Sequence, residues 1–136
     1  MYNANLNYVR SVLGNKTTDS EQLNVFGKNE IPMYIGAFPF DMLPKLENGQ
    51  SAIINQDSSR GGGIHWVAVH QSGGKLYGFD SFNRKINRFV PIRRRIDDGA
   101  VQKSVKQKVR ETDCGQRSLA WLMTVDDIGI NKANIL

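Results

Sequence analysis

Two strand-like stretches around a pair of glycines constrain the fold of this chain more than any other feature. Ile64 to His70 is the most strand-like stretch of the sequence, and Lys75 to Asp80 follows it after Gln71-Ser72-Gly73-Gly74. Such stretches joined by a short glycine-containing turn predict an antiparallel hairpin. Because side chains alternate along a strand, the hairpin also predicts which residues share a face of the sheet.

The hairpin places a histidine opposite an aspartate. His65 and His70 fall on opposite faces, and a turn symmetric about residues 71–74 pairs His70 with Lys75 and His65 with Asp80. Directly opposed residues have Cβ atoms about 4.5–5.5 Å apart, within reach of an imidazole–carboxylate hydrogen bond. The pairing depends on the register, since a slip by one residue exchanges the two faces. A buried structural histidine is an alternative interpretation of His65.

The only cysteine, Cys114, stands just before a stretch that predicts a buried helix running to about Val125. Apolar residues recur there at helical spacing, namely Leu119, Leu122 and Met123. Thr112 or Asp113 is suited to cap the first turn. Cys114 then lies at the positive end of the helix dipole, which favours a thiolate. A lone cysteine is also compatible with a small buried apolar side chain.

The other segments predict both helices and strands. We expect helices at about residues 3–13 and 19–26, the second after a capping-box pattern from Thr18 to Glu21. An extended segment rich in proline and aromatic residues is expected at 31–44. The patterns further predict a strand at 51–55, a glycine-rich loop at 57–63, and strands at 86–92 and 102–109.

Length and composition favour one globular domain, residues 1–136, with a core that needs no disulfide. A single cysteine excludes an internal disulfide, which fits a reducing compartment. The sequence contains no signal peptide and no apolar run long enough to span a bilayer. We therefore expect a protein that acts inside cells and has no membrane partner.

Positive charge is concentrated in one part of the chain. The net charge is +5, and the stretch from Arg84 to Arg110 alone carries ten basic and two acidic side chains. Such a stretch indicates a polyanionic partner, and non-specific binding of DNA is one expectation. A solvated surface with dispersed counter-charges explains the pattern equally well.

A thiol at a helix start, a histidine and a carboxylate are the groups that nucleophilic catalysis requires. The imidazole accepts the thiol proton, the carboxylate fixes the tautomer of the imidazole, and the thiolate attacks a carbonyl. Acyl transfer also needs hydrogen-bond donors for the developing oxyanion. The backbone N–H of Cys114 is one candidate, and Gln107 is a second, with Gln102 and Gln116 as alternatives.

The ordered set of these groups resembles the adenovirus protease (adenain) group of cysteine proteases, which is related to SUMO-specific proteases. The resemblance lies in Ser51-Ala52-Ile53-Ile54-Asn55, the glycine-rich loop, Gly63-Ile64-His65-Trp66-Val67-Ala68-Val69, Tyr77-Gly78-Phe79-Asp80-Ser81-Phe82 and Asp113-Cys114-Gly115. Thr17-Thr18-Asp19-Ser20-Glu21-Gln22-Leu23 and Phe38-Pro39-Phe40-Asp41 resemble segments of such proteases in large DNA viruses and virophages.

The resemblance implies an α+β fold in which a mixed or antiparallel sheet packs on a central helix that bears the nucleophilic Cys114. It implies His65 as general base, Asp80 as orienting carboxylate and Gln107 in the oxyanion hole. Trp66 and Gly63 would contact the substrate, although Trp66 is explained equally well as a core aromatic residue. No metal ion or other cofactor is implied.

The implied activity is that of a cysteine endopeptidase that cleaves viral precursor proteins after small residues, typically glycine, during virion maturation. It would occur in virions and infected cells, and a monomer is expected. Adenovirus protease is activated by a disulfide-linked peptide, for which only Cys114 is present here, and the extra C-terminal elements of larger relatives are missing. Two other functions remain open: an isopeptidase that acts on ubiquitin-like tails, and a small basic nucleic-acid-binding protein without catalysis.

Overall fold

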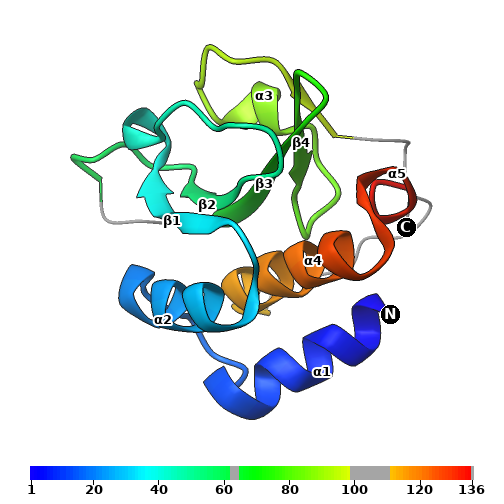
Figure 1. Cartoon of the computed structure of the whole chain (residues 1–136). Helices are drawn as coiled ribbons and strands as arrows, with labels where there is room; N and C mark the ends of the chain where they lie inside the picture. Colours follow the sequence, from blue (N-terminus) through cyan, green and yellow to red (C-terminus); the bar gives the residue numbers. More distant parts are fainter. Residues whose placement is uncertain (62–64, 99–110, 136) are drawn as a thin grey trace.

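The computed structural model describes residues 1–61, 65–98 and 111–135, which form an α+β structure around a mixed five-stranded sheet (Figure 1). The expected α+β class with a mixed sheet is therefore confirmed. Among the described residues, no helix is both long and apolar enough to cross a membrane.

The sheet is ordered β1-β2-β3-β4-β5. Its strands are β1 (Tyr34–Pro39), β2 (Ser51–Asn55), β3 (Trp66–Ser72), β4 (Lys75–Phe79) and β5 (Ile96–Asp97). The central pairs β2–β3 and β3–β4 are antiparallel, whereas the outer pairs β1–β2 and β4–β5 are parallel.

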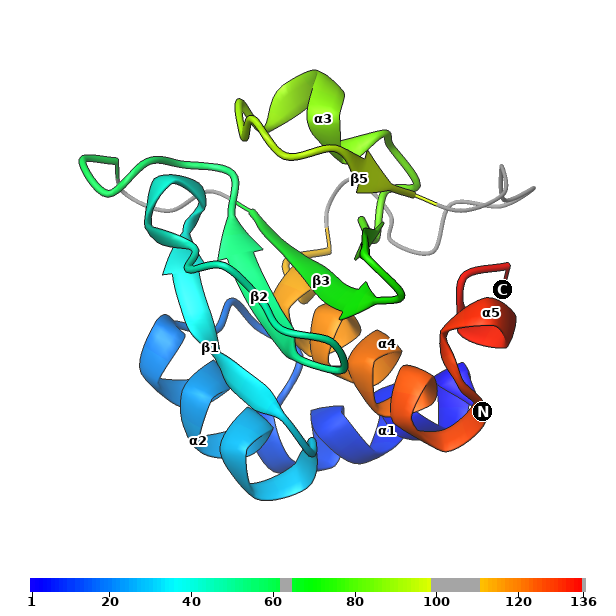
Figure 2. The same ribbon diagram turned by 45° about the horizontal axis from the view of Figure 1, so that its top comes forward.

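Helices lie on both sides of the sheet (Figures 1 and 2). One face carries α1 (Tyr2–Leu13), α2 (Ser20–Glu30), α4 (Cys114–Ile128) and α5 (Ile130–Ala133). The other face carries α3 (Ile86–Phe89), and the short 3-10 helix η1 (Phe40–Met42) follows β1. α4 lies between α1 and the sheet, so that it is the central helix of the structure.

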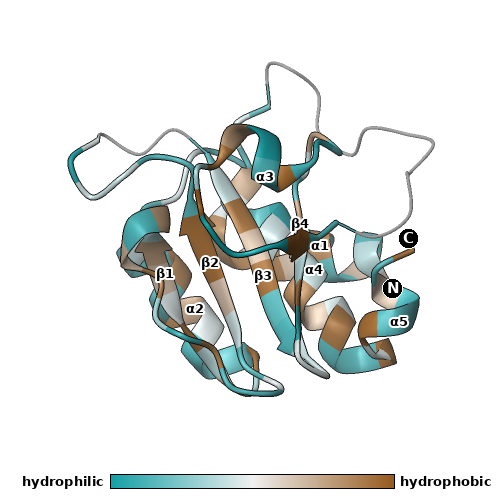
Figure 3. Ribbon diagram, turned by 90° about the horizontal axis from the view of Figure 1, so that it is seen from above, coloured by the Kyte–Doolittle hydropathy of each residue, from teal (hydrophilic) through white to brown (hydrophobic). Residues whose placement is uncertain are grey.

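Both faces of the central strands are buried. Ile53, Ala68 and Phe79 pack with the helices α1, α2 and α4. On the opposite face, Ile54 and Val67 pack with residues of α3 and of the loops around it. A strand covered on both faces has a continuous apolar sequence instead of an alternating one, and apolar residues accordingly run along β2 and much of β3 (Figure 3).

The β3–β4 hairpin is present, but its register differs from the expected one. Gly73 and Gly74 form a two-residue turn in which both φ angles are positive, 56° and 80°, a conformation that glycine adopts without strain. His70 consequently pairs with Tyr77, and the predicted pairing with Lys75 is wrong. The displacement is two residues, so each side chain stays on the face that was predicted for it.

The strand predicted at 86–92 is also wrong, because this segment contains the short helix α3. A side chain, and not a neighbouring strand, accepts from the backbone at the start of this helix: the N–H of Ile86 donates to Asp98, at 3.1 Å. Asn87 donates to the carbonyl of Arg94 and accepts from the N–H of Ile96. Such local side-chain hydrogen bonds compete with strand pairing. The strand predicted at 102–109 lies outside the described residues.

The second predicted helix is longer than expected. α2 begins at Ser20, and its capping box joins Asp19 to Gln22 instead of Thr18 to Glu21. The helix does not end at about residue 26, as expected, but continues through Gly27 to Glu30. A Cβ atom on Gly27 would lie 2.5 Å from the ring of Tyr34, so this glycine permits close packing of α2 on β1.

Candidate active site

Cys114 is the first residue of α4, as the sequence predicts, although the helix ends at Ile128 and not at Val125. α4 is buried on almost every side, with Leu119 and Trp121 fully enclosed. A helix packed in this way has no freedom to shift along its axis. The position of the thiol is therefore fixed by the core of the protein.

Ion pairs join the start of α4 to α1. The buried carboxylate of Asp113 accepts hydrogen bonds from Arg10 of α1 and from Arg117 of α4, the latter at 3.0 Å. Glu111 lies 3.0 Å from Arg117 and 3.6 Å from Arg10. The expected side-chain cap by Thr112 or Asp113 does not form. The two arginines hold the Asp113 carboxylate away from the orphan N–H groups of the first turn.

Glycine is required directly after Cys114. A Cβ atom on Gly115 would lie 2.2 Å from the hydroxyl of Thr18, in the segment that precedes α2. The carbonyl of Thr18 accepts from the indole N–H of Trp66, at 3.1 Å, and Ser118 donates to the carbonyl of Trp66. The N–H of Trp66 in turn donates to the sulfur of Cys114, at 3.4 Å. These contacts bring α2, β3 and α4 together around the thiol.

His65 and Asp80 form the predicted contact, with 2.5 Å between Nε2 and Oδ1. His65 comes just before β3 and Asp80 just after β4, so neither is held in the ladder and the two approach despite the different register. The other carboxylate oxygen of Asp80 accepts from the backbone N–H of Arg84, at 3.0 Å, and from its Nε, at 2.8 Å. Both members of the His65–Asp80 pair are 5% exposed.

Two phenylalanine rings pack against both His65 and Arg84. The imidazole lies 5.2 Å from the ring centre of Phe82 and 6.3 Å from that of Phe89. The guanidinium of Arg84 lies 5.1 Å and 3.9 Å from the same two centres. A cation near an aromatic face is stabilised by the ring quadrupole, so the two rings hold Arg84 beside the His65–Asp80 pair.

The electrostatics of the pair favour an imidazolium. Burial opposes the charge on His65, but hydrogen bonds to Asp80 and Cys114, with attraction to their charges, raise the pKa of His65 from 6.5 to about 9. Burial likewise opposes the charge on Asp80, yet hydrogen bonds from His65 and Arg84 hold the pKa of Asp80 below its ordinary value. Near neutral pH the pair is therefore a protonated imidazole held by a carboxylate.

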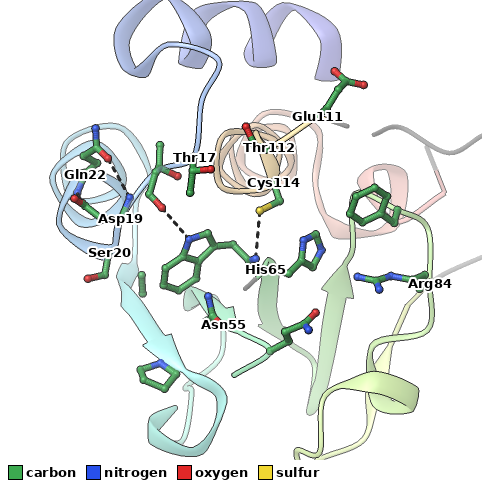
Figure 4. Close-up of a pocket in the computed structure, with 16 residues that line it drawn as sticks. Thr17, Asp19, Ser20, Gln22, Asn55, His65, Arg84, Glu111, Thr112 and Cys114 are labelled. Atoms are coloured by element: carbon green, nitrogen blue, oxygen red, sulfur yellow. Dashed lines mark hydrogen bonds between the residues drawn. The ribbon is translucent and has the colours of Figure 1, made fainter. Parts of the chain in front are cut away.

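Cys114 and His65 line a cleft of about 780 Å³ (Figure 4). Its walls come from the start of α2, the ends of β1 and β2, the start of β3, the loop after β4 and the segment before α4. Cys114 and His65 lie in the middle of the close-up, with Asp19 and Ser20 on one side and Arg84 on the other. Trp66 lines the cleft and also packs against the core.

The remaining candidates fall elsewhere. The amide nitrogen of Gln116 donates to the carbonyls of Gly14 and Lys16, at 3.0 and 2.6 Å, which ties the α1–α2 connection to α4. His70 lies outside the cleft with its Nδ1 2.7 Å from the hydroxyl of Ser51. Three residues predicted from the sequence lie outside the described ranges, namely Gly63, Gln102 and Gln107. Within the described ranges, no cluster of three or more His, Cys, Asp or Glu side chains could hold a metal ion.

Arg84 and the ion pairs of Asp113 were not expected at this site. Arg84 follows Asp80 by four residues, a spacing that indicates contact only within a helix. Here a turn brings them together, with Asn83 at a positive φ of 56°. Arg10 and Asp113 are separated by 103 residues, and no local pattern in the sequence connects them.

Comparison with protein-family models and with curated proteins gave no match for this sequence. The function must therefore be inferred from the residues of the cleft.

Proposed function

We propose that the protein is a cysteine endopeptidase in which Cys114 is the nucleophile, His65 the general base and Asp80 the orienting carboxylate. The observation that supports this most strongly is that a thiol at a helix start and an imidazole that interacts with it line one cleft, while a buried carboxylate binds the same imidazole. These are the parts of a thiol-based acyl-transfer site.

The reaction has two stages. In the reactive state the thiol proton of Cys114 lies on His65, as the raised pKa of this imidazole favours. The thiolate bonds to the scissile carbonyl carbon, and the C–N bond breaks as the imidazolium protonates the leaving nitrogen. The resulting thioester is attacked by a water molecule that gives its proton to His65. The C–S bond then breaks, the acyl product leaves as a carboxylic acid, and the thiolate of Cys114 and the imidazolium of His65 are restored.

The oxyanion of both stages needs hydrogen-bond donors. No side chain of the N-cap residue caps the first turn of α4. The N–H of Cys114 therefore does not have to be taken from a capping side chain to bind an oxyanion. Gln107 is proposed as the second donor from the resemblance to adenovirus proteases. Gln116 is a poor candidate because its amide nitrogen is engaged by two carbonyls.

The resemblance also supplies the biological part of the proposal. The substrates would be viral precursor proteins, cleaved after glycine during virion maturation, in virions and infected cells. Trp66 in the wall of the cleft and Gly63 in the glycine-rich loop would lie against the substrate backbone. The protease would act as a monomer and bind DNA without sequence preference through the stretch from Arg84 to Arg110.

An isopeptidase is the alternative within the same chemistry, because the cleft would serve both kinds of amide bond. A nucleic-acid-binding protein without catalysis is the alternative from another class. Of the basic stretch, Arg93 and Arg95 are exposed, whereas Arg94 donates to the carbonyls of Leu43 and Pro44 and has a structural role.

Thiol labelling tests the proposal, because Cys114 is the only cysteine and every modified protein reports on it. Wild type and His65→Asn are treated with iodoacetamide and with a glycine-terminated peptide electrophile, and intact masses are measured. An active site predicts fast labelling by the peptide electrophile that is lost in His65→Asn. Equal slow labelling of both proteins would contradict the protease assignment. The endopeptidase and the isopeptidase are then distinguished by comparing the rate of cleavage of glycine-containing peptides with that of ubiquitin-like fusion proteins.

A further inference from the structure

We propose that Arg84 binds a carboxylate side chain of the substrate, on the residue that follows the scissile bond. This inference rests on the proposed function and names a feature of its substrate. It starts from the position of Arg84 at the His65 end of the cleft, as Figure 4 shows.

The guanidinium of Arg84 is only partly used by the protein. Nε and Nη2 donate to Asp80, at 2.8 and 3.4 Å, and no described residue accepts from Nη1. The side chain is 44% exposed although it lines the cleft. An arginine has five N–H donors in a fixed plane, so it can serve a second carboxylate without releasing the first.

Arg84 is also held in place before any ligand binds. Its guanidinium lies 3.9 Å from the ring centre of Phe89 and 5.1 Å from that of Phe82, and its backbone N–H is bound to Asp80. Fixing a long side chain on binding normally costs conformational entropy. Folding has already fixed most of the Arg84 side chain, so binding a ligand costs little further entropy. This favours a specific contact between Arg84 and a ligand.

The charges around Arg84 leave it attractive to an anion. Asp80 is shared with the imidazolium of His65, so the three groups together carry a net positive charge when His65 is protonated. Glu111 also lines the cleft, but its carboxylate is engaged by Arg117. Lys85, next to Arg84, is exposed and adds to the positive potential.

Asp98 is the other carboxyl group near this end of the cleft. It lines a small cavity together with Asp80 and Arg84, and one of its oxygens accepts from the N–H of Ile86. Burial and repulsion from Asp80 raise the pKa of Asp98, which weakens the competition of this group for Arg84.

The chemistry of the proposed reaction determines which half of the substrate meets Arg84. The leaving nitrogen must lie against His65 to receive its proton, and Arg84 lies on the side of His65 away from Asp19 and Ser20 (Figure 4). The chain that continues from the leaving nitrogen therefore passes Arg84. Its first side chain is the one placed to reach Nη1.

The test compares peptides that differ only in the residue after the scissile bond, with Glu, the isosteric neutral Gln, or Lys. For wild type we expect kcat/KM to be about fivefold higher for Glu than for Gln, as a half-exposed ion pair allows. In Arg84→Met this ratio should fall to about one, even if the overall rate also falls. Arg88→Met is the matched control, because Arg88 is exposed and does not line the cleft, and it should keep the ratio.

Two measurements keep the test decisive if Arg84→Met folds poorly or the protein cleaves no peptide. The wild-type ratio should shrink as salt is raised from 50 to 500 mM, since the contact is screened. Calorimetry with Cys114→Ala should show tighter binding of a peptide that begins with Glu than of one that begins with Gln. Equal binding and equal kcat/KM would overturn the role of Arg84, whereas preferential binding without cleavage would overturn only the protease proposal.

Discussion

Nε2 of His65 and Oδ1 of Asp80 meet 2.5 Å apart across the open end of the β3–β4 hairpin, one residue beyond each strand. Because neither residue belongs to the β3–β4 ladder, strand pairing does not fix their side chains, and His65 lies near Cys114 while Asp80 binds Arg84. A regular continuation of the hairpin would instead place Asp80 opposite Val67. The irregular ends of the strands thus create the site, while the regular part supports it.

Replacement of the carboxylate tests this pair. In Asp80→Asn the imidazole loses its charged partner, so the pKa of His65 should fall from about 9. Wild-type activity should decline above about pH 9, when no imidazolium remains to protonate the leaving nitrogen. In the variant this decline should begin at lower pH and kcat should fall by about 10² to 10⁴. A pH profile of kcat/KM with the same upper limb in both proteins would contradict the prediction.

The same pair should make stability depend on pH. The pKa of His65 is raised on folding, so its stabilising contribution is fully present below about pH 6.5 and is lost as pH rises through about 9. Thermal unfolding at pH 6.5 and 9.5 measures this loss, and we expect it to be smaller in Asp80→Asn. An equal change of melting temperature in the two proteins would mean that other groups cause the pH dependence.

The two histidines should differ in function. His65→Ala should abolish cleavage, as Cys114→Ala should, because each removes a reacting group while the fold persists. His70→Ala should keep most of the activity, since His70 lies on Ser51 outside the cleft. Circular dichroism checks folding, and a His70→Ala protein that is folded but inactive would refute the assignment.

Two glutamines offer a further contrast. Gln107→Ala should lower kcat by about 10²- to 10³-fold, as loss of one oxyanion donor does, with little change in melting temperature. Gln116→Ala should instead cost about 1–3 kcal/mol of stability, because two carbonyls lose their donor. Kinetics and denaturant unfolding of both variants distinguish the roles, and an unimpaired Gln107→Ala would remove that residue from the site.

Binding to DNA should depend steeply on salt. If about five phosphates are contacted, log affinity should fall with log salt at a slope of about −4 to −5. Arg93→Gln combined with Arg95→Gln should reduce the slope, and Arg94 is left unchanged because it supports the Leu43–Pro44 carbonyls. Fluorescence anisotropy on a random duplex measures the slope. Absence of binding at low salt would leave the basic stretch as a solvated surface.

Local patterns in the sequence were enough to predict the elements with strong periodicity. The strand at 51–55, the hairpin and the helix that begins at Cys114 are all present. The contact of His65 with Asp80 was predicted although the register was not, because an error of two residues preserves the faces of the strands. The alternation of apolar residues does not determine the length of the β3–β4 turn. That length is set by Gly73 and Gly74, which form a two-residue turn.

Contacts between distant or irregular segments could not be predicted. α3 replaces a predicted strand where Asp98 accepts from the N–H of Ile86 and Asn87 binds the backbone of Arg94 and Ile96. Such side-chain hydrogen bonds leave no periodic signal in the sequence. Arg84 reaches Asp80 through a turn, and Arg10 reaches Asp113 across most of the chain. These contacts depend on the tertiary structure and become visible only with it.

The ion pair between Arg10 and Asp113 also bears on when the cleft can exist. Its partners are 103 residues apart, and the thiol follows Asp113 directly. During synthesis, a ribosome-bound chain has α1 and the hairpin well before it has α4, so the cleft cannot close until α4 has emerged. Closing a loop of this length is a late and slow step of folding. The thiol site is therefore assembled only after α4 has been made, because Asp113 and Cys114 follow the other segments that line the cleft.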